Sequence, residues 1–400
     1  MGEGSEGLVS ADVTSPRAGA DWHIITCEYP PRVGGVSDYS LAIAGGLAAA
    51  GGRVHVWCPS ADGPAPAVPG VTVHQELGAF APRDLRRVGR RLNDLPGPQR
   101  LLVQWVPHGY GYRSINVGFA IWLACRAWLR HDELHLMIHE PYLRLLRPLK
   151  YLAASVVQRL MLAIVGSGAA HIWISIPTWA DVVRPYVPRR VPIQWLPVPS
   201  PTLRAANIAD TAAVRAKSTT HDQPIVGHFS SHSAVVTPLL ELALDVVMQR
   251  SEAAVLLIGR DSDIFRAKYL ATRPNLVQRV YATGVLAGDA LSRHLEACEL
   301  MIQPFPDGIN ARHTSALASL ALGVPVVTNS GPHTEAFWRD SDAVALASAP
   351  DGVRVGEAAV DLLQDSSRRA HLADQALKLY DRLFDVRHAI SALRVAAASA

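Results

Sequence analysis

Cysteine is scarce in this sequence: Cys27, Cys58, Cys125 and Cys298 are the only four among 400 residues. No two of them form a CxxC motif, and each lies in an apolar run, which argues against a disulfide framework or a thiolate metal site. We therefore expect buried free thiols, as in a reducing cytosol. Charge is also scarce, because charged residues make up 18% of the chain. The formal net charge of +3 is too small an excess to indicate a nucleic-acid partner.

Long apolar runs and targeting signals are lacking as well. Residues 1–20 have neither a basic start nor an apolar stretch, so they are predicted to form a disordered tail rather than a signal peptide. The longest apolar stretch, Tyr151–Trp173, is interrupted by polar residues and glycines. It falls short of the roughly 20 uninterrupted apolar residues that a membrane span needs. We therefore expect a cytoplasmic protein.

Hydrophobic residues, in contrast, make up 49% of the chain, enough for large cores, and the length of 400 residues suggests two domains. Short β-branched runs alternate with helix-like stretches, which is typical of parallel sheets with helices on both faces. The alternation stops at Leu196–Thr202 and then restarts. We predict an α/β protein with doubly wound domains at 21–205 and 223–380, joined by a linker at 206–222. Two such domains leave a cleft in which the carboxyl ends of both sheets face one ligand.

The individual elements follow from the same alternation. Helices are predicted at Ile115–Arg130, Leu149–Ile164 and Ser366–Ser399. The predicted strands are His23–Cys27, Arg53–Cys58, Leu101–Trp105, Leu134–Ile138, His171–Ser175, Pro224–His228, Ala254–Ile258, Val277–Tyr281, Leu300–Gln303, Val324–Thr328 and Val344–Leu346.

The first motif with chemical meaning is YPPRVGGVSDYS at Tyr29–Ser40, between the first strand and a predicted helix at Ser37–Ala50. Gly34 and Gly35 allow the backbone to approach a ligand closely, and the helix N-terminus favours an anion or a sugar oxygen. The loop lacks GxGxxG and GxxxxGK[ST], so it is neither a dinucleotide fingerprint nor a P-loop. The alternative is a glycine turn with a purely structural role.

The second motif is a histidine at the end of a strand. His139 and Glu140 directly follow the predicted strand Leu134–Ile138, which places them at the carboxyl edge of the sheet, where open α/β sheets bind ligands. His131, His135 and His139 are spaced as on one face of a helix, but the strand alternation would not bring their nitrogens together around a metal. The alternative for His139 is an ordinary loop histidine.

The third motif is Pro304–Gly331, in which a strand ends, a loop carries Asp307 and Gly308, and a helix is predicted at Arg312–Leu322. A carboxylate, free backbone amides and a helix N-terminus converge in this one loop. That combination suits a sugar carrying a diphosphate. The alternative is a tight β–α connection in which Asp307 and Gly308 serve only the turn.

Together, the YPPRVGG loop, the strand-end HE and the DGIN…S…A…GVPVVT segment resemble the retaining GT-B glycosyltransferases of family four, in the right order and over the whole chain after about residue 20. The resemblance implies two Rossmann-like domains, with a nucleotide-sugar donor on the second and the acceptor on the first. It also implies no metal and no cofactor, since the nucleotide diphosphate-sugar is a substrate. The terminal helix, at 381–400, is expected to cross back onto the first domain.

The resemblance assigns roles to individual residues. Gly34 and Gly35 match the glycine pair beside the donor phosphates, and His139 matches the strand-end histidine that contacts the transferred sugar. Asp307 stands at the first carboxylate of the family's EGFGxxxxE segment, with a side chain one methylene shorter. Ser315 stands at the second, so a carboxylate grip on the ribose is missing. His139 and Asp307 are therefore the catalytic candidates.

The other candidates flank these positions. Gly308, Ile309 and Asn310 are expected to contact the donor with their backbone amides. Asp38 and Glu140 are expected on the acceptor side.

The chain departs from the family at the start of the second domain. An Arg and a Lys normally neutralise the diphosphate there, but this chain reads GHFSSHSAVVTP, with His228 in place of the Arg and no lysine before Lys268. Cations aimed at a leaving diphosphate contribute several kcal/mol to lowering the barrier. Arg312, with His313 beside it, is the predicted substitute; the alternative is a solvated arginine.

The predicted function is metal-independent transfer of a sugar, with retention, from a nucleotide diphosphate-sugar to a hydroxyl of a small-molecule, glycan or lipid-linked acceptor. The alternatives are a nucleotide-sugar 2-epimerase and a catalytically silent GT-B protein that acts as a binding or scaffold subunit.

Peripheral contact with the inner face of an anionic membrane is a secondary hypothesis. It rests on two apolar segments that carry cations. Ile121–Trp128 contains Arg126, with Arg130 just beyond it, and Leu143–Lys150 contains Arg144, Arg147 and Lys150. The alternative is a pair of helices packed on the sheet with arginines at their edges.

Overall fold

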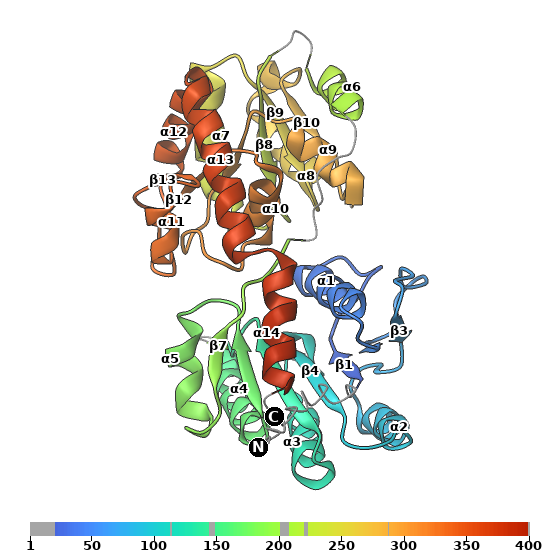
Figure 1. Cartoon of the computed structure of the whole chain (residues 1–400). Coiled ribbons are helices and arrows are strands. Elements are labelled where there is room, and N and C mark those ends of the chain that lie inside the picture. The colour runs from blue at the N-terminus through green and yellow to red at the C-terminus, as the bar shows by residue number, and fades with distance from the viewer. Residues whose placement is uncertain are drawn as a thin grey trace, which may run out of the picture.

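The chain folds into two parallel β-sheets, one above the other, each covered by helices on both faces (Figure 1). This arrangement confirms the predicted α/β architecture with two doubly wound domains. The computed structural model describes residues 21–112, 114–143, 149–200, 208–219, 223–286 and 288–398.

The first sheet has seven strands in the order β3-β2-β1-β4-β5-β6-β7, and every described pair is parallel. All four residues of β1 are buried, as is usual in parallel sheets covered on both faces. The strands are β1 (Trp22–Ile25), β2 (Val54–Trp57), β3 (Val71–His74), β4 (Arg100–Trp105), β5 (Glu133–Ile138), β6 (His171–Ile174) and β7 (Ile193–Trp195).

The second sheet has six strands in the order β10-β9-β8-β11-β12-β13, again parallel. The strand order reverses between β1 and β4 in the first sheet and between β8 and β11 in the second, and ligands of such sheets bind beside these switch points. The strands are β8 (Ile225–Phe229), β9 (Ala254–Ile258), β10 (Val280–Ala282), β11 (Leu300–Gln303), β12 (Val326–Asn329) and β13 (Ala345–Ala347).

The helices return the chain from one strand to the next. They are α1 (Gly35–Ala49), α2 (Pro82–Asn93), α3 (Val117–Arg130), α4 (Leu149–Ser167), α5 (Trp179–Val183), α6 (Ile208–Ser218), α7 (Thr237–Arg250), α8 (Ser262–Ala271), α9 (Gly288–Glu296), α10 (Thr314–Leu322), α11 (Ala336–Asp340), α12 (Gly352–Gln364), α13 (Ser366–Leu383) and α14 (Val386–Ala398). Short 3₁₀ turns lie at η1 (Pro107–Gly109), η2 (Arg184–Tyr186) and η3 (Pro274–Leu276).

Three helix starts differ from the prediction, and each difference has a local cause. α3 begins at Val117 rather than Ile115, because the Asn116 side chain accepts a hydrogen bond from the Phe119 amide and caps the helix. α1 begins at Gly35 rather than Ser37, because the Glu28 carboxylate accepts hydrogen bonds from its first-turn amides. α10 begins at Thr314 rather than Arg312. The Asn310 side chain accepts a hydrogen bond from the Arg312 amide and so holds a separate turn in front of this helix.

The chain passes between the domains twice. The segment predicted as a linker contains α6, whose Arg215 donates to the Ala297 carbonyl (2.8 Å) and pairs with Glu299 (2.7 Å), so this helix packs on the second domain. After α13 the chain crosses back, and α14 lies against the first domain (Figure 1). There Ile390 packs on Gly46 of α1, at which a side chain would collide with it. Among the described residues, no helix is both long enough and apolar enough to span a bilayer.

Candidate active site

The carboxyl edges of the two sheets face each other, and two arginines of the second domain connect them to the first. Arg260, just after β9, donates a hydrogen bond to the Val33 carbonyl in the glycine loop (2.9 Å). Arg312, in the loop before α10, pairs with Glu140 just after β5 (Nη1–Oε1, 3.6 Å). The loops that the sequence singled out in separate domains therefore meet at one place.

A carboxylate of the chain itself, that of Glu28, binds the backbone amides that follow the glycine pair. Glu28 Oε1 accepts hydrogen bonds from the amides of Val36 and Ser37, both 3.2 Å long, at the start of α1. A Cβ atom at Gly34 would collide with this carboxylate, whereas nothing lies within 4 Å of the corresponding position at Gly35. A side chain at Gly34 would therefore displace the Glu28 carboxylate from these amides. These amides are already satisfied by a negative group of the chain itself.

His139 is uncharged at neutral pH. Burial lowers the pKa of its imidazole to about 4. Its Nε2 lies 2.8 Å from Gln104 Oε1, an acceptor, so Nε2–H donates and Nδ1 is left free to accept. The Tyr39 ring meets the imidazole edge-on at 4.8 Å between centroids. Tyr39 Oη and Gln104 Nε2 are buried without a hydrogen-bond partner among the described residues.

Glu140 joins His108 and Arg312. Its Oε2 lies 3.2 Å from His108 Nδ1 and its Oε1 faces the Arg312 guanidinium. The hydrogen bond between His108 and Glu140 lowers the pKa of Glu140 and raises the pKa of His108. The other residue predicted on the acceptor side is Asp38, whose pKa is raised to about 6 by burial and by the nearby Glu28 carboxylate. The acceptor-side candidates are therefore two carboxyl groups with opposite pKa shifts.

The loop after β11 is held rigidly against its neighbour. Gly308 has φ +77, in the left-handed region, and a Cβ there would overlap the backbone of Gly331. The Ile309 amide donates to the Asn329 carbonyl (2.9 Å), as in a tight β–α connection, while Asp307 is exposed. Asn310, which is fully buried, supports the turn in front of α10.

The residues around the start of α10 differ in charge. The His313 ring stacks on Phe305 with 3.7 Å between centroids, and burial together with Arg312 lowers its pKa to about 3. His313 therefore supplies no positive charge, while Arg312 does, lying 5.8 Å above the Trp179 ring of the first domain. Ser315 is in the first turn of α10, a helix without a side-chain cap.

His228 is also neutral. It is buried at the end of β8, with Nδ1 2.7 Å from the Ile302 carbonyl and Nε2 2.8 Å from Ser230 Oγ. Burial is the main cause that lowers its pKa to about 3. His228 thus occupies the position at which the family's arginine was expected without replacing its charge.

Sequence reasoning missed two residues of this site, Arg260 and Glu335. Arg260 follows Gly259 at the end of a fully buried strand, and that strand-end position was the available signal. Glu335 lies beside the loop after β11: its Oε1 accepts from the Ala311 amide (3.2 Å) and its Oε2 from Trp338 Nε1 (3.0 Å). Burial raises the pKa of Glu335 to about 7. No sequence pattern pointed to it, because its partners come together only in the fold.

Within the described parts of the chain, no group of three or more histidine, cysteine, aspartate or glutamate side chains gathers as a metal site would require.

No protein-family model matches the sequence, and neither does the sequence of any curated protein. Solved structures, in contrast, share the whole fold. HepE of Anabaena in complex with UDP and glucose has a TM-score of 0.69 at 15% identity, over 95% of this chain and 100% of that chain. Sucrose-phosphate synthase of Thermosynechococcus elongatus has a TM-score of 0.68 at 15% identity, over 94% of this chain and 98% of that chain.

WaaG, a glycosyltransferase involved in lipopolysaccharide biosynthesis, has a TM-score of 0.65 at 16% identity, over 94% of this chain and 98% of that chain. The similarity in each case extends across both domains. The predicted resemblance is confirmed at the level of the fold, and this chain has the GT-B fold of these glycosyltransferases.

Proposed function

We propose that this protein is a retaining glycosyltransferase that transfers a sugar from a nucleotide diphosphate-sugar to a hydroxyl group. The observation that carries the proposal is the contact of Arg312 with Glu140, beside the neutral His139, where the two sheets face each other. An arginine from one domain, and a neutral hydrogen-bonding imidazole from the other, suit a leaving diphosphate and a sugar ring respectively.

The reaction breaks the bond between the anomeric carbon and the diphosphate oxygen and forms a bond from that carbon to the acceptor oxygen. The acceptor proton passes to the departing phosphate, so the two substrates supply all atoms. Arg312 and Arg260 would stabilise the negative charge that develops on the diphosphate, in the role that metal ions play elsewhere. Asp307 and His139 would bind the sugar hydroxyls.

The donor we expect carries UDP, because HepE has been crystallised with UDP and glucose on the same fold. The acceptor binds on the side of the first domain, near Asp38 and Glu140. It is a small molecule, a glycan or a lipid-linked sugar. Cys58 and Cys298 are buried free thiols, which suits a protein of the reducing cytoplasm.

Binding of UDP, GDP, ADP and dTDP, measured by thermal shift, is the first test, since a ligand that binds the folded state raises the melting temperature. We expect UDP to stabilise the protein most; a larger shift with another of the four would change the expected donor. Mass spectrometry of products, with the matching nucleotide-sugar and a panel of acceptors, then measures transfer. We expect transfer to continue at the same rate in EDTA; a strict need for added Mg²⁺ or Mn²⁺ would contradict the metal-independent mechanism.

One observation favours a second candidate, a GT-B protein that binds nucleotide-sugars without turnover. His228 and His313 are both neutral, so they add no charge to that of the arginines at the donor phosphates. Nucleotide binding without transfer or hydrolysis would establish this second function. Conversion of the donor into another nucleotide-sugar in the absence of an acceptor would instead identify a 2-epimerase.

A further inference from the structure

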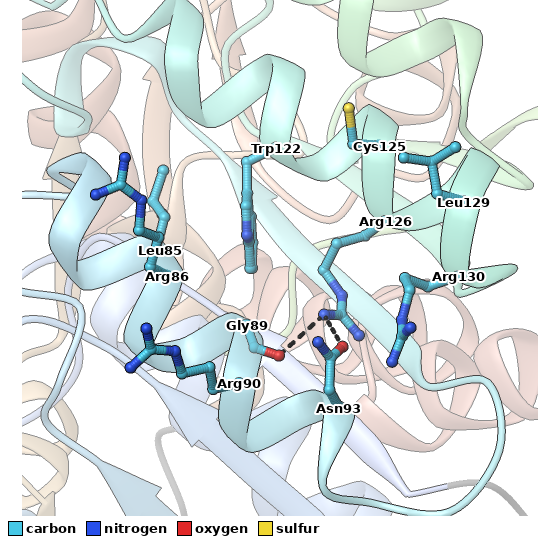
Figure 2. Close-up of a pocket in the computed structure, with 10 residues that line it drawn as sticks. All are labelled: Leu85, Arg86, Gly89, Arg90, Asn93, Trp122, Cys125, Arg126, Leu129 and Arg130. Carbon is cyan, nitrogen blue, oxygen red and sulfur yellow. Dashed lines mark hydrogen bonds between the residues drawn. The ribbon is translucent and has the colours of Figure 1, made fainter.

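An open groove of about 320 Å³ lies between α2 and α3 of the first domain (Figure 2). We call it the α2–α3 groove, and six side chains characterise it: Leu85, Arg86 and Arg90 of α2, and Trp122, Leu129 and Arg130 of α3. Apolar side chains thus line a groove that carries arginines on both rims. None of these residues has a part in the proposed sugar transfer.

The arginines of the groove differ from their neighbours on α2. Arg83 and Arg87 pair with Asp84, at 3.8 and 3.0 Å, and Arg91 pairs with Glu76. The arginines of α2 that lie away from the groove therefore have carboxylate partners within the chain.

The side chains of Arg86, Arg90 and Arg130, in contrast, are exposed and have no ion pair or hydrogen bond with any described residue. The groove therefore concentrates unpaired positive charge, which favours an anionic partner over a purely apolar one.

Arg126, which the sequence placed on the proposed membrane face, has a different role. It is buried, pairs with Asp132, and donates to the Gly89 carbonyl and to Asn93 Oδ1 (3.0 Å), as the dashed lines in Figure 2 show. It fixes α3 to α2 and forms the floor between the two basic rims. Of the other cations predicted on this face, Arg144, Arg147 and the side chain of Lys150 lie outside the described residues.

Exposed apolar side chains continue from the groove across α3. Ile121, Trp128 and Leu129 are 47%, 53% and 73% exposed, and with Cys125 they follow the i, i+4, i+7, i+8 spacing of one helix face. α4, which packs beside α3, exposes a second stripe of three residues at four-residue intervals: Leu152, Val156 and Leu160. Large apolar side chains at this density are not what an ordinary solvated surface shows.

The position of this surface leaves the candidate active site accessible. α2 and α3 lie at the end of the first domain that is turned away from the second domain (Figure 1). Arg90 and Arg130 are in the last turns of these helices, and in a parallel α/β domain the helices run back from the carboxyl edge of the sheet. A large partner can therefore cover the groove without closing the gap between the domains.

We propose that the α2–α3 groove, with the apolar stripes of α3 and α4, binds the surface of a membrane that contains anionic phospholipids. Unpaired guanidinium groups fit lipid phosphates at headgroup depth, and exposed tryptophan and leucine side chains fit the boundary with the acyl chains. A nucleic acid would match the charge but not the apolar stripes. This membrane site goes beyond the proposed sugar transfer and does not depend on it.

The test is flotation of the full-length protein with phosphatidylcholine vesicles and with vesicles in which about a third of this lipid is replaced by phosphatidylglycerol. We expect binding only to the second kind, and weaker binding as the salt concentration rises. Each arginine near an anionic surface contributes enough that the double variant R86Q/R90Q should bind about 30-fold more weakly. Arg382→Gln, an exposed arginine of α13 without a described partner, is the matched control and should bind like the wild type.

Further arms of the experiment separate the membrane from other occupants. Trp128→Ser with Leu129→Ser should weaken flotation while the dependence on salt persists, because these side chains contribute apolar burial. Equal flotation of wild type and R86Q/R90Q would overturn the proposal. Saturable binding of inorganic phosphate alone to the groove would also overturn it, because the ligand would then be a soluble anion. A dimer that forms without lipid and is dissociated by R86Q/R90Q would overturn it as well, because a second copy of the chain would then occupy the groove. Transfer to a soluble acceptor should be unaffected by R86Q/R90Q, so this result is independent of the proposed activity.

Discussion

The starts of α1 and α10 each lie beside the switch point of their own sheet, after β1 and β11, and their backbone amides are satisfied in different ways. Each helix follows a strand beside the switch point of its sheet, and each directs its first amides toward the other domain's edge. In α1 the Glu28 carboxylate accepts from two of these amides. In α10 no side chain caps the helix, and the cation Arg312 lies two residues before its first residue, Thr314.

The difference indicates which domain receives a negatively charged ligand. A helix N-terminus attracts an anion, but one that already holds a carboxylate repels a second. This difference supports the proposal that the second domain provides the diphosphate position. The first domain, with neutral His139 and the carboxyl groups of Asp38 and Glu140, is suited to sugar hydroxyls. Substitutions in the two regions should accordingly change different measured quantities.

The largest effect is expected from His139→Ala. Loss of a hydrogen-bonding group at the transferred sugar should lower kcat about 100- to 1,000-fold. Nucleoside diphosphate affinity should change little, because His139 belongs to the first domain. Steady-state kinetics combined with calorimetric titration of the nucleotide checks both quantities. A variant with unchanged kcat would return His139 to the role of an ordinary loop histidine.

The next effect in size is expected from Arg312→Ala. A charge-assisted contact with a phosphate contributes roughly 1.5–3 kcal/mol, so nucleoside diphosphate affinity should fall about 10- to 150-fold while nucleoside affinity is preserved. Arg312→Lys should retain part of the nucleoside diphosphate affinity that Arg312→Ala loses, since lysine keeps the charge but lacks the planar guanidinium fork.

Glu140→Gln is the matched control for Arg312. It breaks the same contact between the domains from the other side but leaves the cation in place. Nucleoside diphosphate affinity should then be unchanged or higher. If both variants lose affinity equally, the pair holds the domains together and Arg312 does not bind phosphate.

The close approach of the Glu28 carboxylate to Gly34 predicts that substitutions at this glycine change the stability of the protein. Gly34→Ala places a Cβ against Glu28 and should lower the free energy of unfolding by about 1–3 kcal/mol. Gly35→Ala, with open space around the same position, should change it by less than about 0.5 kcal/mol. The double variant Glu28→Ala/Gly34→Ala should recover part of the loss relative to Gly34→Ala. Urea denaturation measures all four proteins, and equal stability of the two glycine variants would remove the assigned role of Gly34.

The fold could be predicted from the sequence because its parallel strands are continuous apolar runs. β5 and β9, which are buried almost throughout, were placed to within one or two residues. β3 and β7 were not predicted, because these edge strands are short, only partly buried and less regular in pattern. Helix α2 was missed as well, since its sequence is dominated by arginine and its apolar residues are few.

The site was less predictable than the fold, because much of it depends on charge states and on contacts between distant segments. The histidines at 228 and 313 look like replacements for missing cations in the sequence, but burial keeps both neutral. Arg260 lies 227 residues from the carbonyl of Val33 to which it donates. Neither burial nor such a contact can be inferred from local pattern, whereas strand-end positions such as His139 can.

The smallest effect is expected from Glu335, which the fold places beside the open helix start. Its pKa is about 7 in the folded protein against an ordinary value of 4.5, mainly because burial penalises the charged form. The folded state therefore binds a proton more tightly than the unfolded state. The stabilising contribution is complete below pH 4.5 and is lost as the pH rises through 7.

Glu335→Gln should remove this pH dependence, because the amide is neutral at every pH while its oxygen still accepts one hydrogen bond. Between pH 5 and pH 8 the wild type should lose on the order of 1–2 kcal/mol more stability than the variant, allowing for partial exposure of the carboxyl. This loss corresponds to a few degrees in Tm, measured by calorimetry at both pH values. A nucleoside diphosphate should enlarge the difference, because an anion at the start of α10 disfavours ionisation of the neighbouring carboxyl. Parallel Tm profiles for wild type and variant, with and without the nucleotide, would show that Glu335 is ionised throughout and that the start of α10, like that of α1, already lies beside a negative charge of the chain's own.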